Sequence, residues 1–176
     1  MNKLRIVILG VFILAACFRG MAFAETDSWL YTEAINEANK GNYEFSFLHL
    51  HSLVRSYPES KYLENALFAI GEHHFKDNNS SGAVDSFSQL LEKFPDSKST
   101  LFTLAYLLKI AQARKAENLA TDLEKAIVTF HKLSLVFRDS KEFTYKSAFQ
   151  NSYKAVYFID KVELYKNDEL FTQVLY

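Results

Sequence analysis

The histidines are the side chains here that could most readily do chemistry, but their spacing does not suit a metal or a catalytic site. The chain has 5 histidines. His49 and His51 lie two positions apart, so on a helix they point to different faces. His73 and His74 are adjacent, and the sequence has no His-Glu-x-x-His pattern, the helical spacing of zinc proteases. We therefore expect no metal site.

Other patterns that would indicate catalysis are missing from the sequence as well. The 5 glycines are scattered and form no phosphate-binding loop. No serine stands in the Gly-x-Ser-x-Gly context of a nucleophile elbow. The formal net charge of -1 gives no basis for nucleic-acid binding. The sequence therefore predicts a protein that is not an enzyme, needs no cofactor and acts through other proteins.

The N-terminus has the features of an export signal. Lys3 and Arg5 precede an apolar run over residues 6–16, which matches the basic and hydrophobic parts of a secretory signal peptide. The small residues Ala22 and Ala24 predict cleavage after Ala24. The mature protein is then expected in the periplasm.

A second cleavage site competes with the first. Cys17 is the only cysteine, and the residues before it, Leu14-Ala15-Ala16, look like a bacterial lipobox. Cleavage before Cys17 would make this residue a lipidated N-terminus, and the protein an outer-membrane lipoprotein that faces the periplasm. The first site is favoured because Phe18 and residues 21–24 are apolar, whereas the tether of a lipoprotein is usually polar. Membrane contact is expected only through this alternative anchor.

A five-residue sequence motif, which we call the phrase, occurs three times in the rest of the chain. Its copies are Tyr57-Pro58-Glu59-Ser60-Lys61, Phe94-Pro95-Asp96-Ser97-Lys98 and Phe137-Arg138-Asp139-Ser140-Lys141, spaced by 37 and 43 residues. Proline disfavours helix, while an acidic residue followed by serine is typical of turns and helix N-caps. Each copy predicts that one helix ends and another begins, with the serine accepting N–H groups of the new helix. Such a spacing indicates stacked repeats.

Apolar periodicity predicts a mainly α fold, an α-solenoid of three antiparallel helix pairs. The expected helices span residues 27–39, 42–57, 59–76, 83–94, 100–115 and 119–137. Another helix is expected over residues 142–154. Alternating apolar residues from Val162 to Tyr176, with turn residues at 166–169, predict a short C-terminal β-hairpin.

The helix pairs resemble tetratricopeptide repeats, in which glycine or alanine lies where two helices cross and large apolar residues fill the space between repeats. The first repeat matches at Gly41, Tyr43, Ser46, Leu50, Leu53 and Pro58. The second matches at Leu67, Ile70, Gly71, His74, Ala83, Phe87, Leu90 and Pro95. The third keeps Ala126, Phe130 and Leu133, with Arg138 in place of the proline.

Within the repeat family, the proline phrase resembles that of BamD-like outer-membrane lipoproteins and of the periplasmic Tol–Pal coordinator. The predicted organisation thus has three parts. Residues 1–24 form the signal peptide, residues 25–141 the repeats, and residues 142–176 the last helix and the hairpin.

The resemblance implies a concave groove lined by the first helix of each pair. The residues that map to this groove are Tyr31, Asn65, Phe68, Glu72, Phe75, Lys76, Phe102 and Lys109. Aromatic residues inside a polar rim suit the binding of a partner peptide. The alternative is that these aromatic residues pack against the next helix or against the hairpin.

Two functions follow from this interpretation. The first is a non-enzymatic interaction module or scaffold of the bacterial cell envelope, which binds a partner peptide or complex subunit through its concave face. The alternative is a structural or oligomerising unit whose C-terminal hairpin pairs with another chain.

Overall fold

The computed structural model describes residues 26–137 and 142–176, of which residues 130–137 are described by their backbone alone. The predicted signal peptide, both cleavage sites with Cys17, and the last four residues of the third phrase lie outside these ranges. The described residues contain six helices followed by four strands, which confirms the predicted helical repeats.

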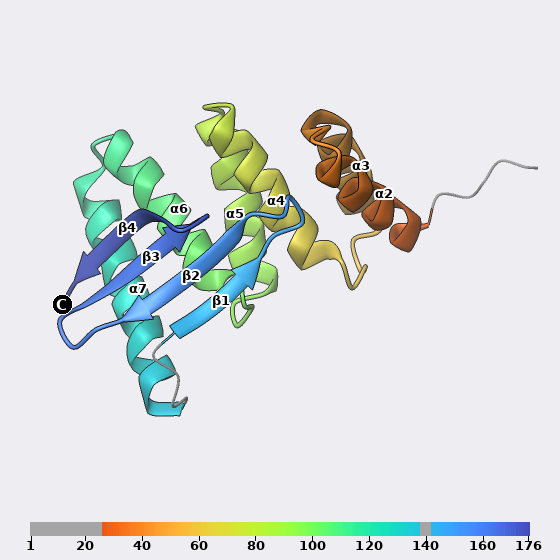
Figure 1. Cartoon of the computed structure of the whole chain (residues 1–176). Helices are drawn as coiled ribbons and strands as arrows, with labels where there is room; N and C mark the ends of the chain where they lie inside the picture. The colour runs from red at the N-terminus through yellow and green to blue at the C-terminus, as the bar shows by residue number, and fades with distance from the viewer. Residues whose placement is uncertain (1–25, 138–141) are drawn as a thin grey trace, which may run out of the picture.

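The helices form three antiparallel pairs (Figure 1). They are α2 (Asp27–Asn39), α3 (Tyr43–Ser56), α4 (Leu63–Lys76), α5 (Ser80–Lys93), α6 (Thr100–Ala113) and α7 (Glu117–Phe137). Each agrees with its predicted range within a few residues at either end. None of the described helices has both the length and the apolar composition that a membrane crossing requires.

The first two copies of the phrase form tight turns between the pairs. In the first, the Tyr57 N–H still donates to the carbonyl of Leu53, and then the helix ends. The Ser60 hydroxyl accepts from the Tyr62 N–H at 3.2 Å, one residue before α4 begins. The serine therefore orders the turn, and α4 begins at Leu63, four residues later than predicted.

Small residues let the helices of the second repeat cross closely. Gly71 on α4 faces the ring of Phe87 on α5, and a Cβ atom added at Gly71 would lie 2.7 Å from two of the ring carbons. Both residues are fully or almost fully buried. The role that the repeat pattern predicts for this glycine is therefore confirmed.

The four strands form one antiparallel sheet in the order β1-β2-β3-β4. They are β1 (Glu142–Lys146), β2 (Ser152–Tyr157), β3 (Lys161–Lys166) and β4 (Glu169–Leu175). Asn167 and Asp168 both have positive φ, 51° and 64°, as a two-residue type I′ turn requires. The predicted C-terminal hairpin is thus confirmed as β3 and β4.

The helix predicted over residues 142–154 is wrong, because this segment forms β1, a short turn and the start of β2. Phe143 and Tyr145 alternate with polar neighbours, which is the period of a strand. Gln150 has a φ of 64°, which no helix interior accepts, and it lies in the turn between the two strands. The hairpin therefore extends to four strands, and β3 pairs with β2.

One face of the sheet packs against the helices (Figure 1). Along β2 and β3, buried residues alternate with more exposed ones. The buried residues are Tyr153, Ala155, Tyr157, Val162 and Leu164. These side chains belong to the same hydrophobic core as Phe68, Phe87, Phe102 and Tyr106 of the helices. The second and third helix pairs therefore share one core with the sheet, whereas the first pair forms a second core with α4 and with Ala148 and Phe149.

We predict that Gly71→Ala lowers the free energy of unfolding by about 1–3 kcal/mol, the usual cost of adding a methyl group to a tightly packed site. At a helix position without this contact, the same substitution would instead stabilise the protein by about 1 kcal/mol, because alanine is the better helix former. Urea unfolding of Gly71→Ala, Phe87→Leu and the double variant checks this. The smaller leucine side chain should reduce the cost of Gly71→Ala, and an unchanged cost in the Phe87→Leu background would contradict the packing argument.

Candidate functional site

Most of the predicted groove residues lie on α4 and α6, and the C-terminal sheet packs on these helices (Figure 1). Phe68, Phe75, Asn65 and Glu72 come from α4, while Phe102 and Lys109 come from α6. These are the first helices of the second and third pairs. We call the surface of α4 and α6 that the sheet covers the concave face.

Aromatic side chains of the strands pack on the aromatic side chains of the concave face. Phe68 lies edge to face with Tyr145 and Tyr153, at centroid distances of 5.1 Å and 5.4 Å. Phe102 stacks on Phe143 of β1 at 6.0 Å. Phe68 and Phe102 are 0% and 1% exposed, so neither is available to a second protein while the sheet is in place.

The C-terminal half of the concave face is covered by the last strand. Phe75 lies 6.3 Å from the ring of Phe171 on β4. Lys109 donates to the carbonyl of Phe171 at 2.8 Å and lies over the same ring. At the other end, the Tyr145 hydroxyl donates to the side-chain oxygen of Asn65 at 3.2 Å. Two of the polar residues predicted to form the rim of the groove, Asn65 and Lys109, thus hold the sheet.

Glu72 is the charged centre of this contact and is 2% exposed. Its Oε1 atom accepts hydrogen bonds from the Tyr153 hydroxyl and, at 2.9 Å, from the Asn151 amide. The Lys166 ammonium lies 3.6 Å from the same oxygen. Lys166 also donates to Tyr106 at 2.7 Å, and the Tyr106 and Tyr153 hydroxyls are 2.5 Å apart. A carboxylate of α4 is therefore tied to β2, to β3 and to the turn before β2.

Burial determines the electrostatics of this network. It raises the pKa of Glu72, while the Lys166 charge and the hydrogen bonds from Tyr153 and Asn151 oppose that rise. Burial and the charge of Glu72 raise the pKa of both Tyr106 and Tyr153 well above the usual value of 10.0. Both phenols therefore stay protonated near neutral pH and act as hydrogen-bond donors. The arrangement suits holding a sheet in place.

The two remaining predicted residues lie at the border of the covered surface. Tyr31 of α2 is half-buried and stacks on Tyr62 at 4.4 Å, and a hydrogen bond with Asn65 opposes the rise in the pKa of Tyr31 that burial causes. Lys76 is exposed, and its ammonium lies over the Tyr43 ring, 4.9 Å from the centroid. Neither residue contributes to the centre of the contact with the sheet.

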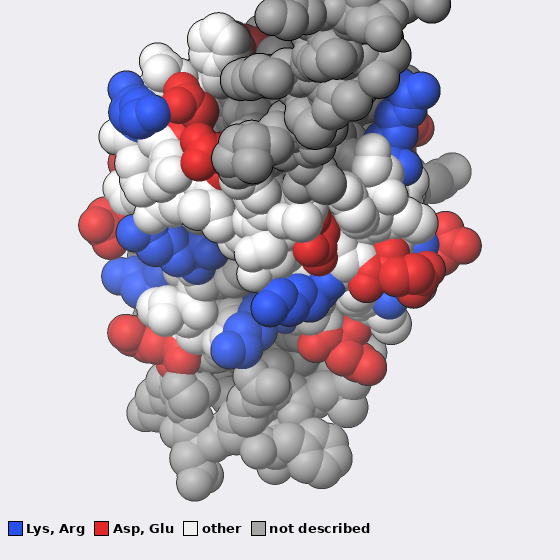
Figure 2. All heavy atoms as spheres, turned by 90° about the vertical axis from the view of Figure 1, so that its right-hand side faces the viewer, with Lys and Arg blue, Asp and Glu red and all other residues white. Residues whose placement is uncertain are grey.

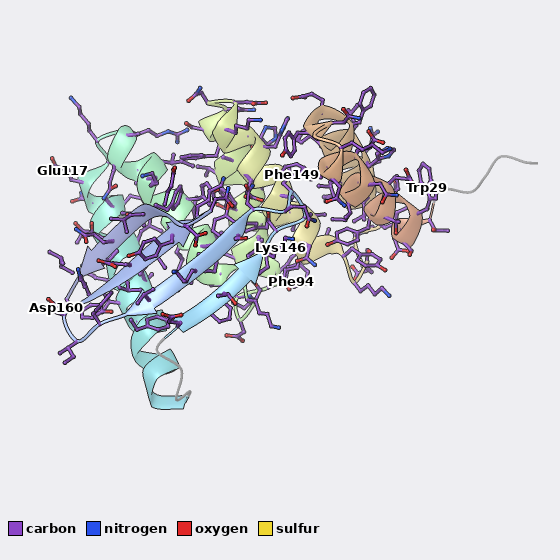
Figure 3. The ribbon with its side chains drawn as sticks, viewed as in Figure 1. Trp29, Phe94, Glu117, Lys146, Phe149 and Asp160 are labelled. Atoms are coloured by element: carbon purple, nitrogen blue, oxygen red, sulfur yellow. The ribbon has the colours of Figure 1, made fainter. Side chains whose placement is uncertain are left out.

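A small opening remains next to Glu72, where the turn after β1 approaches the first helix pair. Phe149 of this turn reaches toward α4 (Figure 3). The opening has a volume of about 230 Å³ and is lined by Tyr43, Glu72, His73, Lys76, Phe149, Asn151 and Lys166. Two of the predicted groove residues, Glu72 and Lys76, line this opening.

The sheet residues that complete this site, and Tyr106 of α6, were not among the predicted site residues. Tyr106 lies 47 residues before Tyr153 and 60 before Lys166, and no local pattern connects these residues with Glu72. One signal was available. Tyr153, Ala155 and Tyr157 recur at every second position, which indicates a strand with one buried face.

We predict that the stability gained from Glu72 depends on pH. Because the folded protein holds the pKa of Glu72 above its ordinary value of 4.5, ionisation opposes folding. The glutamine side chain of the Glu72→Gln variant has no proton to lose. The free energy of unfolding of the wild type, measured relative to this variant, should be greatest below pH 4.5 and should fall as pH rises toward the folded-state pKa of Glu72.

Urea unfolding of the wild type and of Glu72→Gln at about pH 4 and pH 7 measures this difference. Glu92→Gln, at an exposed position of α5, is the matched control for the loss of one carboxylate. A difference between wild type and Glu72→Gln that grows in favour of the wild type as pH rises would contradict the prediction.

Comparison with known proteins agrees with the repeat pattern. A family model described as an outer membrane lipoprotein, YfiO, matches residues 23–155. The match covers all six described helices, β1 and the first part of β2. A search of curated proteins finds no match. The resemblance to BamD-like lipoproteins is therefore confirmed, and the chain belongs to the YfiO family of outer membrane lipoproteins.

Proposed function

We propose that this protein is a non-enzymatic scaffold of the bacterial cell envelope in which the chain's own sheet fills the concave face. Membership in the YfiO family supports a place in the envelope. The observation that carries the proposal is the complete burial of Phe68 and Phe102 beneath the sheet. The concave face then acts as an internal docking site, and partner proteins bind elsewhere.

The exposed apolar residues of the first helix pair are our candidate for the partner contact. Trp29, Phe45 and Leu48 are 42%, 60% and 57% exposed, and we call them the first-repeat face. Phe45, Leu48 and His49 lie three and four positions apart, so they share one side of α3. The Trp29 ring contacts His49 at 5.5 Å, which extends this side onto α2. Large exposed apolar residues that lie together commonly mark protein contacts.

The charge around the first helix pair fits a partner protein better than a highly charged ligand. Figure 2 views the molecule from the side on which α2 and α3 lie in Figure 1. Basic and acidic side chains alternate over the described residues in this view, and neither sign forms a continuous patch. Apolar anchors with mixed charges around them are typical of protein interfaces.

The lipid anchor belongs to the same proposal. Cys17 is the only cysteine in the sequence, and it follows a lipobox-like segment. The residues near Ala24 favour cleavage there, but membership in a family of outer membrane lipoproteins weighs toward Cys17. We therefore propose that Cys17 is lipidated and holds the scaffold at the outer membrane, facing the periplasm.

We predict that a photo-crosslinking amino acid at Phe45 or Leu48 captures a partner protein in living cells. The same amino acid at Phe75, which lies under Phe171, should give no intermolecular product. Immunoblotting for the shifted band measures both, and Glu92 on α5 serves as an exposed control position. Capture at Phe75 with none at Phe45 or Leu48 would mean that partners enter the concave face after the sheet has left it.

We predict that Cys17→Ser moves the protein from the membrane fraction to the soluble periplasmic fraction. Loss of the thiol removes the atom that would carry the lipid, and Cys17 lies outside the described residues. Fractionation and mass spectrometry of the mature N-terminus measure the change. A wild-type protein that begins at Glu25 would refute the lipid anchor and leave the scaffold proposal standing.

A further inference from the structure

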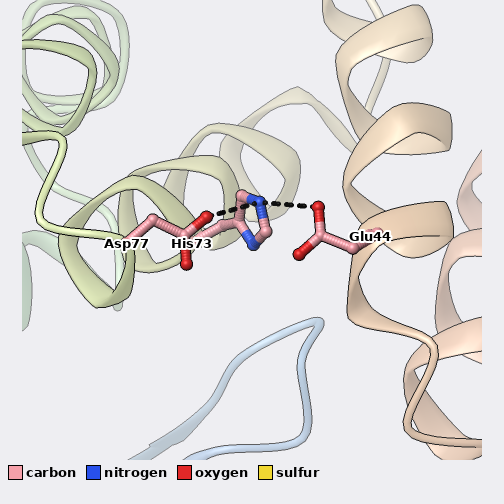
Figure 4. A group of neighbouring side chains, drawn as sticks. All are labelled: Glu44, His73 and Asp77. Carbon is pink, nitrogen blue, oxygen red and sulfur yellow. Dashed lines mark ion pairs between the residues drawn. The ribbon is translucent and has the colours of Figure 1, made fainter.

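Three potential metal ligands meet where the first repeat packs on the second (Figure 4). Glu44 lies in the first turn of α3, His73 in the last turn of α4, and Asp77 caps the end of α4. The Nε2 atom of His73 is 3.2 Å from Asp77 Oδ2 and 3.5 Å from Glu44 Oε2. All three ligand atoms lie within 4.8 Å of one another.

The separations of His73 Nε2 from the two carboxylate oxygens suit a single tetrahedral zinc ion. Zinc binds histidine nitrogen and carboxylate oxygen at about 2.0–2.2 Å, so neighbouring ligand atoms of a tetrahedron are about 3.3–3.6 Å apart. Both distances from His73 Nε2 fall at or near this range. Magnesium and calcium prefer oxygen ligands alone, so the imidazole nitrogen favours a transition metal.

The imidazole ring is held in the orientation that such a site needs. The His73 side chain is 6% exposed, and its ring stacks on Phe47 at 4.3 Å. Phe149, from the turn between β1 and β2, lies 6.1 Å from the same ring. The ring is thus fixed by packing from two elements, and its Nε2 atom points between two carboxylates. Fixed ligands lower the entropic cost of binding a metal.

An ion pair without metal accounts less well for this arrangement. A protonated Nε2 atom carries one hydrogen, which it can donate in line to one oxygen only. The two carboxylates together carry two negative charges, and one imidazolium balances half of them. The nearby ammonium of Lys76 lies over the Tyr43 ring. A divalent cation satisfies both carboxylates at once.

We propose that Glu44, His73 and Asp77 form a zinc site that joins the first repeat to the second. Glu44 and Asp77 are 78% and 49% exposed, so the fourth position of the ion faces solvent and is filled by water. Among the described residues, the first helix pair packs on a neighbouring repeat only through its contact with the second repeat. The ion would add a link at this junction, independently of the scaffold function proposed above.

Zinc titration of the processed protein, purified without a histidine tag, tests this site. Isothermal calorimetry should give one ion per chain. Co²⁺, used as a spectroscopic probe, should show the visible absorption of a tetrahedral site. Glu44→Gln and Asp77→Asn should each weaken zinc binding by more than about tenfold, since removing even an outer-sphere partner of a metal ligand costs about that much.

Both substitutions are at exposed positions, so they should leave the fold intact and keep the test valid. Circular dichroism before titration verifies this. His51→Gln and His74→Gln are the matched controls, because they remove neighbouring imidazoles and should keep wild-type affinity. Zinc should raise the melting temperature of the wild type and of both controls. Equal zinc affinity in the wild type, Glu44→Gln and Asp77→Asn, or no stoichiometric binding at all, would overturn the proposal.

Discussion

The rest of the structure depends on the burial of one carboxylate, Glu72, between the helices and the sheet. A charged side chain that leaves water must recover its lost hydration through hydrogen bonds and an opposite charge. Here Tyr153, Asn151 and Lys166 provide them to Oε1, and all three come from the C-terminal segment, while the buried Oε2 has no hydrogen-bond partner among the described residues. If the sheet left the concave face, Glu72 would regain water but the phenol of Tyr153 and a large aromatic surface would be exposed. The sheet and the second repeat therefore form one cooperative unit.

Buried polar contacts of this kind contribute to specificity more than to net stability. A protein in which well-packed apolar residues replace a buried ion pair is often as stable as the original or more stable. Apolar residues, however, would also tolerate other positions of the sheet on the helices. In the sheet, a slip of one residue would exchange the buried and exposed faces of β2. Such a slip would turn Tyr153 away from Glu72 and place Lys154 against the aromatic side chains of α4 and α6. The polar network thus makes one register much more favourable than its neighbours.

The helical repeats could be predicted because their signals are local, whereas the site could not. Pro58, Ser60 and Gly71 each act on residues within a turn or on the adjacent helix, so spacing alone locates them. Two of the predicted groove residues, Phe68 and Phe102, lie on α4 and α6 and pack against aromatic side chains of the strands. What covers them was decided by residues 143–171, whose contacts with α4 and α6 span about 60 to 80 positions. The proximity of Glu44 and His73 could not be predicted either, because they lie on different helices. His73 and Asp77 are four residues apart, so their proximity at the end of one helix could be predicted from spacing.

A filled concave face changes how so short a repeat array can be stable. In an open solenoid each repeat touches only its neighbours, and few repeats give a marginal core. Here Tyr153 contacts Phe68 of the second pair and Phe102 of the third at the same time, while Tyr106 contacts Phe87, Phe171 and Lys166. The sheet therefore joins two repeats across their inner side and adds long-range contacts that the stacking alone lacks. The first repeat stays outside this shared core, since its buried residues form a second cluster with Ala66, Ala69 and Ile70 of α4 and with Ala148 and Phe149 of the turn between β1 and β2. The sheet therefore braces the second and third repeats directly, whereas the first repeat, which carries the exposed Trp29, Phe45 and Leu48, is held through α4 and through the turn between β1 and β2.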